Sequence, residues 1–207
     1  MYSGEKASAL ASVRHFLDMA RAAPVLPMTA SHYARIADDF FTAEIEQVDL
    51  FAWAVTGRGA LQTVRFDDAE QLVVDPERST GVLGANRHAG SLLVTLDPAV
   101  PRAVVALRLK AEMATVRLKP VTSLVESRWM LSGQVREGCG FAIEAQGFGP
   151  GEMHWQTEAG RQFIVTAGRQ GQELLTETHR ADAEGQLRFT LPLDAIEPMT
   201  IRLKCNE

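Results

Sequence analysis

The sequence lacks any run of about 18 or more apolar residues, so no segment is predicted to cross a bilayer as a helix. It also lacks a basic excess, because 21 Lys and Arg stand against 26 Asp and Glu, a formal net charge of -5. Nonspecific binding to nucleic acid or to an anionic membrane needs a basic face, so both are disfavoured. Disorder is not indicated either, since hydrophobic residues make up 46% of the 207 residues and can form a core.

Residues 1–23 lack the uninterrupted apolar region of a secretory signal peptide, because Glu5, His15 and Asp18 interrupt them. Read alone, the chain would be expected in the cytosol. If the chain is a piece of a longer protein, this observation leaves its localisation unknown.

Cysteine is scarce. Cys139 and Cys205 are too few for a disulfide scaffold and too far apart for a CxxC metal or redox motif. The first expectation is a pair of buried thiols. The alternative is one bridge that ties the last strand to an earlier one, which would need an oxidising compartment.

Motifs for catalysis or metal binding are also missing. The five histidines form no HxxH, HxxxH or HExxH pattern, so each is expected to be a surface or packed residue: His15, His32, His88, His154 and His179. There is no GxSxG elbow, and neither cysteine has a histidine nearby in the sequence. We therefore predict no catalytic residue, no metal site and no cofactor.

Two glycine-rich stretches, 81–90 and 147–152, lack the Lys-Ser/Thr and the following helix of a phosphate-binding loop. Both are predicted to be turns in a β-rich chain. The adjacent carboxylates Asp67 and Asp68 are interpreted as a solvated turn, because neighbouring side chains at the end of a strand usually diverge.

Residues 1–44 are predicted to be helical. Apolar residues recur at i, i+3 and i+4 spacing from Ala7 to Ala20, and Pro24 ends that helix. Thr29 or Ser31 can cap a second helix. The apolar side of that helix is formed by Tyr33, Ile36, Ala37, Phe40 and Phe41.

From about residue 45 the apolar residues alternate or form short runs between turn residues, which indicates strands. In a first β-rich module, 45–120, strands are expected at 48–55, 60–66, 91–96, 103–109 and 114–119. The stretch 67–90 is predicted to be a long loop with at most one short strand. In a second module, 121–207, strands are expected at 127–135, 140–148, 152–156, 161–167, 173–178, 186–191 and 199–205.

The predicted fold class is mainly β: an antiparallel β-sandwich or jelly-roll-like region preceded by two α-helices. The last predicted strand has the clearest alternation, with Met199, Ile201, Leu203 and Cys205 on one side. It remains open at this point whether the two modules form one sandwich or two.

The three tryptophans are the candidate carbohydrate-binding residues, because a flat indole can stack on a sugar ring. Trp53, Trp129 and Trp155 are each expected on a strand, where a tryptophan usually belongs to the core. Trp53 shares its face with Phe51 and Val55, which favours the core. Trp155 follows a glycine-rich turn and is the best candidate for an exposed platform.

The opening of the chain resembles a known family. "YSGEKASALASVRHFLDMA" followed by "PMTASHYARIADDFF" is similar to the end of the deacetylase barrel in the Pel-type exopolysaccharide deacetylase–hydrolases. Ala30, Ser31, Tyr33 and Arg35 match its "ASxYxR" stretch. "GALQTVRF" is similar to its "G.LRT.R" strand, with Gln62 in place of the usual Arg, and "RSTGVLG" at 78–84 to its "RSxGVAG" loop.

This resemblance covers residues 2–119 in patches, and it depends on the order and spacing of several short motifs. It implies that the helices are the last part of a barrel whose Asp and two His metal ligands lie upstream, so no catalytic residue is carried over. It also implies a periplasmic or extracellular parent and a terminal β module that ends in a cysteine, compatible with Cys205.

The leading hypothesis is a non-catalytic C-terminal accessory region of a polysaccharide-modifying enzyme, which braces the catalytic barrel and binds glycan near it. Its expected partners are the polysaccharide or the missing barrel. The alternative is a protein–protein interaction module of an exopolysaccharide or biofilm assembly. An enzyme with a site of its own on the sheets is a third, less favoured reading. The apolar flank of the helices, including Phe16, Leu17, Phe40 and Phe41, is expected to be exposed for a partner.

Overall fold

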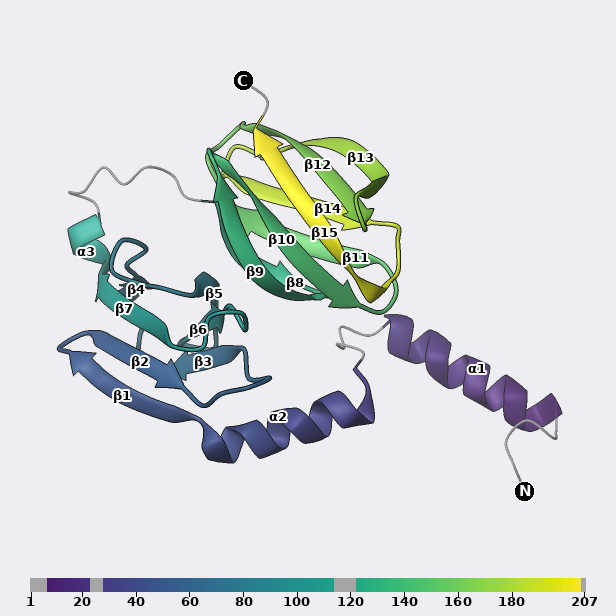
Figure 1. The fold of residues 1–207 in the computed structure, drawn as a ribbon, viewed down its shortest axis with the longest axis horizontal. Coiled ribbons are helices and arrows are strands. Elements are labelled where there is room, and N and C mark those ends of the chain that lie inside the picture. The colour runs from purple at the N-terminus through teal and green to yellow at the C-terminus, as the bar shows by residue number, and fades with distance from the viewer. Residues whose placement is uncertain (1–6, 23–27, 114–121, 206–207) are drawn as a thin grey trace.

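The structure is a computed structural model, and it describes residues 7–22, 28–113 and 122–205. Two helices, α1 (Ala7–Ala22) and α2 (Ala30–Thr42), precede a long series of mainly antiparallel strands (Figure 1). The predicted fold class, a mainly β chain with a sandwich-like region behind two helices, is confirmed.

The two helices form where the apolar spacing predicts them. At α2, Thr29 is the N-cap, and its side-chain oxygen accepts a hydrogen bond from the backbone N–H of His32 at 3.2 Å. The predicted strand at 114–119 lies outside the described residues.

A first group of strands, which we call the N-terminal β unit, follows α2. One sheet has the order β1-β2-β7-β4. Its strands are β1 (Glu44–Asp49), β2 (Ala52–Thr56), β4 (Leu72–Val74) and β7 (Ala103–Leu109), and the short helix α3 (Lys110–Met113) follows β7. The unit also contains β3 (Thr63–Phe66), β5 (Val82–His88) and β6 (Ser91–Leu96). A core of valine, leucine and alanine side chains joins these strands, and Val94, Leu96 and Val105 are fully buried in it.

The remaining strands form what we call the C-terminal β unit. Five of them make a sheet with the order β13-β12-β15-β10-β9. Their bounds are β9 (Met130–Glu137), β10 (Gly140–Gly147), β12 (Gln162–Arg169), β13 (Gln172–Arg180) and β15 (Ala195–Cys205). The other strands are β8 (Ser123–Ser127), β11 (Gly151–Gln156) and β14 (Gln186–Leu191).

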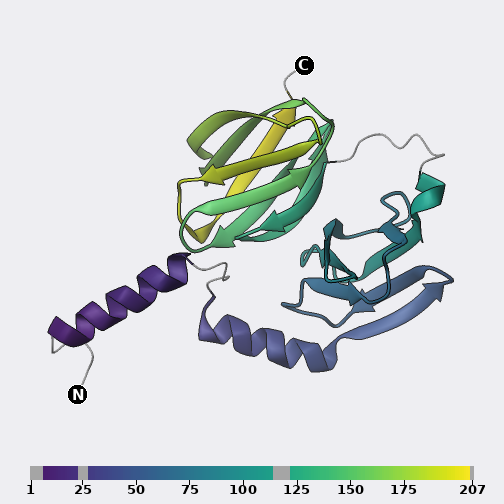
Figure 2. The ribbon, with the colours of Figure 1, turned by 180° about the vertical axis from the view of Figure 1, so that it is seen from behind.

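The two layers of the C-terminal β unit enclose one core. Side chains from both layers are buried in it, among them Phe141, Trp155, Phe163 and Ile201. Figure 2 shows the layers from behind, with β11 and β14 in front of β15. The alternation predicted for the last strand is confirmed, because Met199, Ile201 and Leu203 are buried while Arg202 and Lys204 are exposed.

One sheet runs through both units. Its order is β14-β11-β8-β5-β6-β3, and the junction is a parallel pairing of β5 with β8 at Gly84 and Leu124. The chains approach so closely there that a Cβ added to Gly84 would lie 1.9 Å from the carbonyl oxygen of Leu124. Gly84 is therefore needed because only a residue without a side chain lets the two backbones come this close. The prediction of a turn over 81–90 is wrong for 82–88, which form β5.

Two stretches that were each expected to form a single strand are interrupted by a turn or a bend. Residues 48–55 were expected to form one strand, but β1 and β2 make an antiparallel hairpin with its tip at Leu50 and Phe51. The turn was missed because its tip is apolar: Leu50 is 73% exposed and continues the apolar run from one strand to the next. Similarly, the strand expected at 127–135 divides into β8 and β9 around a bend at Arg128 and Trp129. The loop expected at 67–90 contains two strands, β4 and β5.

Candidate functional site

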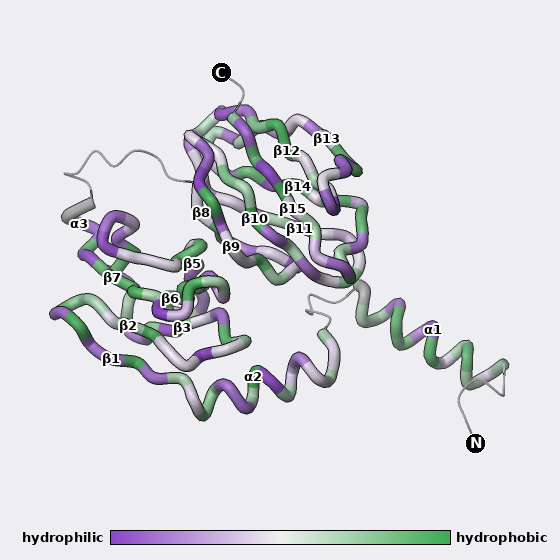
Figure 3. The backbone as a smooth tube through the Cα atoms, viewed as in Figure 1, coloured by the Kyte–Doolittle hydropathy of each residue, from purple (hydrophilic) through white to green (hydrophobic). Residues whose placement is uncertain are grey.

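The two leading helices leave their apolar side chains exposed, as expected. Phe41 is 84% exposed and Phe16 is 64% exposed, and α2 buries none of its residues. Figure 3 shows hydrophobic positions recurring along both helices. We call this set the helical apolar surface: Leu10, Val13, Phe16, Leu17 and Met19 on α1, and Tyr33, Phe40 and Phe41 on α2.

The last turn of α2 is fixed to the N-terminal β unit. Thr42 Oγ1 donates a hydrogen bond to the carbonyl of Gly57 at 2.9 Å, and Asp39 Oδ2 accepts one from the backbone N–H of Ala60 at 2.6 Å. A side chain on Gly59 would collide with the Asp39 carboxylate. The helix is thus held by its polar side and its end, while Phe40 and Phe41 stay exposed.

The exposed tryptophan platform predicted from the sequence is wrong. Trp155 is fully buried, with its ring 4.5 Å from that of Phe141. Trp129 is 2% exposed, lies in the bend between β8 and β9, and donates its Nε1–H to the carbonyl of Gly149 at 3.0 Å. Neither indole can stack on a sugar.

Trp53 is partly buried and lies at the margin of the core, so the core interpretation favoured for it holds only in part. It packs against the core of the N-terminal β unit, and its ring centroid lies 5.1 Å from that of Phe66.

The residues beside Trp155 are the ones that the sequence reasoning missed. On β11, Met153 and Trp155 face the core, so His154 and Gln156 face the other way. Together with Gln186 of β14 they line a cleft between the two β units. The sequence could have shown this, because neighbouring residues of a strand face opposite sides of the sheet. If Trp155 faces the core, His154 and Gln156 must face away from it.

The histidines are dispersed. No group of three or more His, Cys, Asp or Glu in the described ranges is arranged to hold a metal ion. His154 Nε2 is hydrogen-bonded to Gln186 Oε1, and His179 Nε2 lies 2.9 Å from Glu177 Oε2. Similarly, no helix within those ranges combines the length and the apolarity that a bilayer crossing needs.

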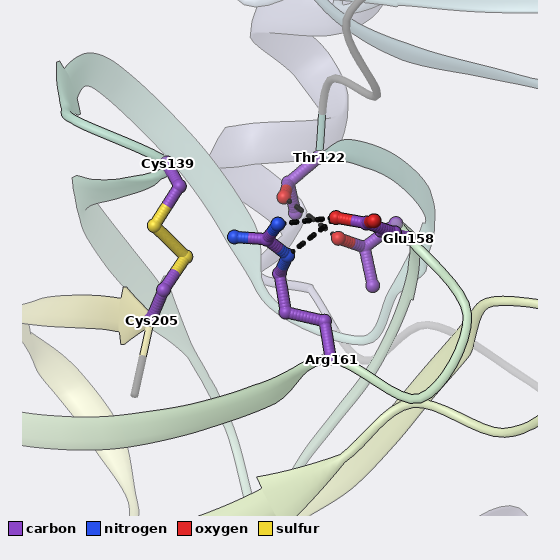
Figure 4. Close-up of a disulfide and its surroundings, with 6 residues drawn as sticks. Thr122, Cys139, Glu158, Arg161 and Cys205 are labelled. Carbon is purple, nitrogen blue, oxygen red and sulfur yellow. Dashed lines mark hydrogen bonds and ion pairs between the residues drawn. A yellow bond between two sulfur atoms is a disulfide. The ribbon is translucent and has the colours of Figure 1, made fainter. Parts of the chain in front are cut away.

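Cys139 and Cys205 form a disulfide, with their Cα atoms 6.1 Å apart (Figure 4). The expectation of two buried thiols is therefore wrong, and the alternative of a bridge is correct. Cys139 immediately precedes β10 and Cys205 ends β15, which are neighbours in the sheet. The antiparallel register brings the two ends together, and sequence distance alone could not show this.

Within the described part of the chain, the pKa values of three groups are shifted, and each group contacts a structural partner. Burial lowers the pKa of Arg58, although the charge of Asp97 opposes this. Burial would raise the pKa of Asp75, but the hydrogen bond from Arg108 and the backbone N–H groups of the following turn lower it overall. Hydrogen bonds from Ser91 and Arg65 lower the pKa of Asp67, whose exposed side chain lies in a turn with Asp68, so the predicted solvated turn is confirmed.

Comparison of the chain with protein-family models, curated proteins and solved structures found no match. The resemblance to the Pel-type family therefore stays a prediction. Function has to be inferred from the exposed, buried and paired residues of the chain itself.

Proposed function

We propose that this chain is a non-catalytic accessory region of a polysaccharide-modifying enzyme, and that it docks on the catalytic barrel through the helical apolar surface. The observation that carries the proposal is the exposure of large apolar side chains on both leading helices, with Phe16, Phe40 and Phe41 each at least 64% exposed. Several large apolar side chains exposed on one helix usually mark an interaction site, and each of the two helices carries such a set.

The energetics support a partner. Burying one large apolar side chain contributes about 1.5–3 kcal/mol, so three phenylalanines and their neighbours supply a substantial part of a stable interface. α2 is already fixed at Asp39 and Thr42, so docking would not have to order its last turn.

A barrel in an oxidising compartment is the occupant that we infer. The family resemblance, which the comparisons leave untested, would make these helices the end of a deacetylase barrel. The disulfide between Cys139 and Cys205 is of the kind that persists in secreted and periplasmic proteins, which agrees with a periplasmic or extracellular parent.

A binding experiment tests the proposal directly. The chain is mixed with the deacetylase barrel of a Pel-type enzyme that lacks its own C-terminal region, and complex formation is followed by light scattering after size exclusion. We expect a one-to-one complex, and Phe16→Asp with Phe41→Asp should weaken it at least about a hundredfold. Leu174→Asp, at an exposed position on β13, is the matched control and should leave binding unchanged. Equal binding by all variants, or no complex, would contradict the proposal.

The alternative function, a protein–protein interaction module of an exopolysaccharide assembly, is favoured by one other feature. β1 is the edge strand of its sheet, and all six of its residues are exposed, including Ile45 and Val48. An exposed edge can pair with a strand of another protein. Under this alternative, Ile45→Lys would abolish capture of the partner, whereas barrel docking would persist.

A further inference from the structure

A cleft of about 1030 Å³ separates the N-terminal and C-terminal β units. The described residues that form its walls come from seven strands and two loops, and both units contribute, so the cleft exists only when the units are joined. The polar residues that line it include Asn86, Gln134, Gln156, Gln186, His154 and Arg136. Such a volume is at the upper end of the range for small-molecule sites, so the cleft can hold more than one sugar-sized ring.

Strand alternation supplies one wall. On β11, His154 and Gln156 point away from the core that contains Trp155. The antiparallel register places Gln156 opposite Gln186 of β14 on one side and opposite Ser123 of β8 on the other. Three neighbouring strands thus present polar side chains in one row.

Hydrogen bonds fix the orientation of this row. Gln186 Oε1 is bonded to His154 Nε2, and because an oxygen only accepts, the imidazole is the donor. Gln186 Nε2 donates to Gln156 Oε1, and Gln156 Nε2 donates to the carbonyl of Glu184 at 3.0 Å. In the neutral imidazole, Nδ1 is then an acceptor, and it has no partner among the described residues. The row is preorganised and keeps acceptor capacity for a ligand.

The facing wall supplies unused donors. The side-chain nitrogen of Gln134 on β9 is buried and has no hydrogen-bond partner within the described part of the chain. Buried polar groups are nearly always paired, so this one points to a missing acceptor. Arg136, two residues further along β9, makes no ion pair with any described residue.

The charges of the cleft exclude a cationic ligand. Of the described residues that line the cleft, Asp97 alone has a carboxylate, and its two oxygens already accept the backbone N–H groups of Ala99, Gly133 and Gln134. Arg87 donates to the carbonyls of Ala69 and Leu72. These carbonyl bonds leave the positive charge of Arg87 in place, and neither Arg87 nor Arg136 has an ion pair with a described residue, so both guanidinium groups would repel an ammonium group.

From these observations we infer that the cleft binds a neutral oligosaccharide segment. Amide side chains offer both a donor and an acceptor, which suits the hydroxyl and acetamido groups of a sugar. Val82 and Val125 add apolar surface for ring C–H groups. Among the described residues no Phe, Tyr or Trp lines the cleft, so recognition there uses hydrogen bonds and not stacking on a large aromatic ring. The inference rests on the proposed function for the class of polymer. It deepens that function by assigning the glycan to the cleft. The acetylated form should bind better than the deacetylated form, which carries ammonium groups.

The test is an NMR titration of the whole chain, with side-chain amide and imidazole signals as the readout. The probes are N-acetylchitotetraose, cellotetraose, the deacetylated tetramer of glucosamine and a neutral polar tetrapeptide. With a Kd of about 1 mM, the neutral saccharides should shift the signals of Gln134, Gln156 and Gln186, and the deacetylated tetramer should bind at least about fivefold more weakly.

Variants separate cleft binding from other effects. Gln186→Ala and, independently, Gln134→Ala should each weaken binding about tenfold. Arg188→Ala is the matched control, because Arg188 lies on the same strand and face but outside the cleft, and it should bind like the wild type. Shifts of cleft signals by saccharide in the wild type support the inference even if one variant does not fold. No shift with any saccharide, shifts only outside the cleft, or binding of the tetrapeptide alone would overturn it.

Failure here is distinguishable from failure of the proposed docking. Loss of saccharide binding with intact barrel docking through Phe16 and Phe41 would leave a purely bracing role. Saccharide binding without barrel docking would leave a glycan-binding module whose helices serve another purpose.

Discussion

The carboxylate of Asp97 accepts a hydrogen bond from the backbone N–H of Gly133 at 2.8 Å, across the boundary between the two β units. Its second oxygen accepts the N–H of Gln134 at 2.9 Å, and the backbone N–H of Ala99 bonds to the first. Arg58 donates to the carbonyl of Asp97 from the N-terminal side. Together with the Gly84–Leu124 pairing, this buried side chain sets how the units face each other and hence the shape of the cleft.

Replacing Asp97 should therefore loosen the junction. In Asp97→Ala, three backbone N–H groups lose their acceptor, and we expect the free energy of unfolding to fall by about 3 kcal/mol or more. Asp97→Asn keeps one acceptor oxygen and should lose about half as much. Asp194→Ala, at an exposed position, should change it by less than about 0.5 kcal/mol. Urea unfolding measures all three, and a small effect in Asp97→Ala would contradict this role.

The parallel junction gives a second prediction. In Gly84→Ala the new Cβ would lie 1.9 Å from the carbonyl oxygen of Leu124, so β5 and β8 must separate. We expect a loss of about 2–4 kcal/mol and higher amide exchange in both strands. In Gly138→Ala nothing lies within 4 Å of the new Cβ, and the positive φ of 64° alone should cost about 1 kcal/mol. Similar losses in the two variants would show that the junction is not tightly packed.

Asp75 gives a prediction about pH. Its carboxylate pairs with Arg108 and is almost inaccessible to solvent, and the pKa is lowered from its ordinary value of 3.8. A lowered pKa means that the stabilisation is complete above the ordinary value and is lost as the pH falls toward the folded-state pKa. The difference in unfolding free energy between wild type and Asp75→Asn should therefore be largest near neutral pH and shrink below about pH 3.8. A difference that stays constant through acid would refute the pairing.

The disulfide closes a loop across a sequence separation of 66 residues. The chain-entropy model assigns a cross-link of this length about 4 kcal/mol of stability. Cys139→Ser with Cys205→Ser should lower the free energy of unfolding by about 3–4 kcal/mol under oxidising conditions. The same measurement with a reducing agent is the control, because reduction should lower the wild type to the level of the variant and leave the variant unchanged.

Local patterns predicted much of the fold. β6, β7 and β14 occupy the expected residues, because each alternating run is bounded by turn residues. The two helices and the Thr29 cap were also expected, since spacing and capping are local properties.

The errors and omissions have two physical causes: one residue type can serve two purposes, and pairing between distant strands leaves no local signal. Glycine-rich residues 81–90 were taken for a turn, but Gly84 is small because another backbone passes close to it. Leu50 and Phe51 extend an apolar run through an exposed hairpin tip. Asp97 and the row that joins His154 to Gln186 depend on pairing between distant strands, which no local window contains.

The two buried tryptophans of the C-terminal β unit differ in one hydrogen bond. Trp129 Nε1 donates to the carbonyl of Gly149, whereas Trp155 Nε1 is buried with no partner among the described residues. Replacement by phenylalanine removes ring volume at both positions. At Trp129 it also leaves the Gly149 carbonyl without this donor, and at Trp155 it removes an unpaired polar group.

We therefore expect Trp129→Phe to destabilise the protein by about 1–3 kcal/mol more than Trp155→Phe does, as measured by urea unfolding. Truncation to alanine gives the reference, because Trp155→Ala should cost about 3–5 kcal/mol at a fully buried position. Equal losses for the two phenylalanine variants would mean that the Trp155 indole has a partner after all. The same variants test the cleft from its far side, since Trp155→Phe keeps an aromatic ring behind His154 and Gln156 and should leave saccharide binding unchanged.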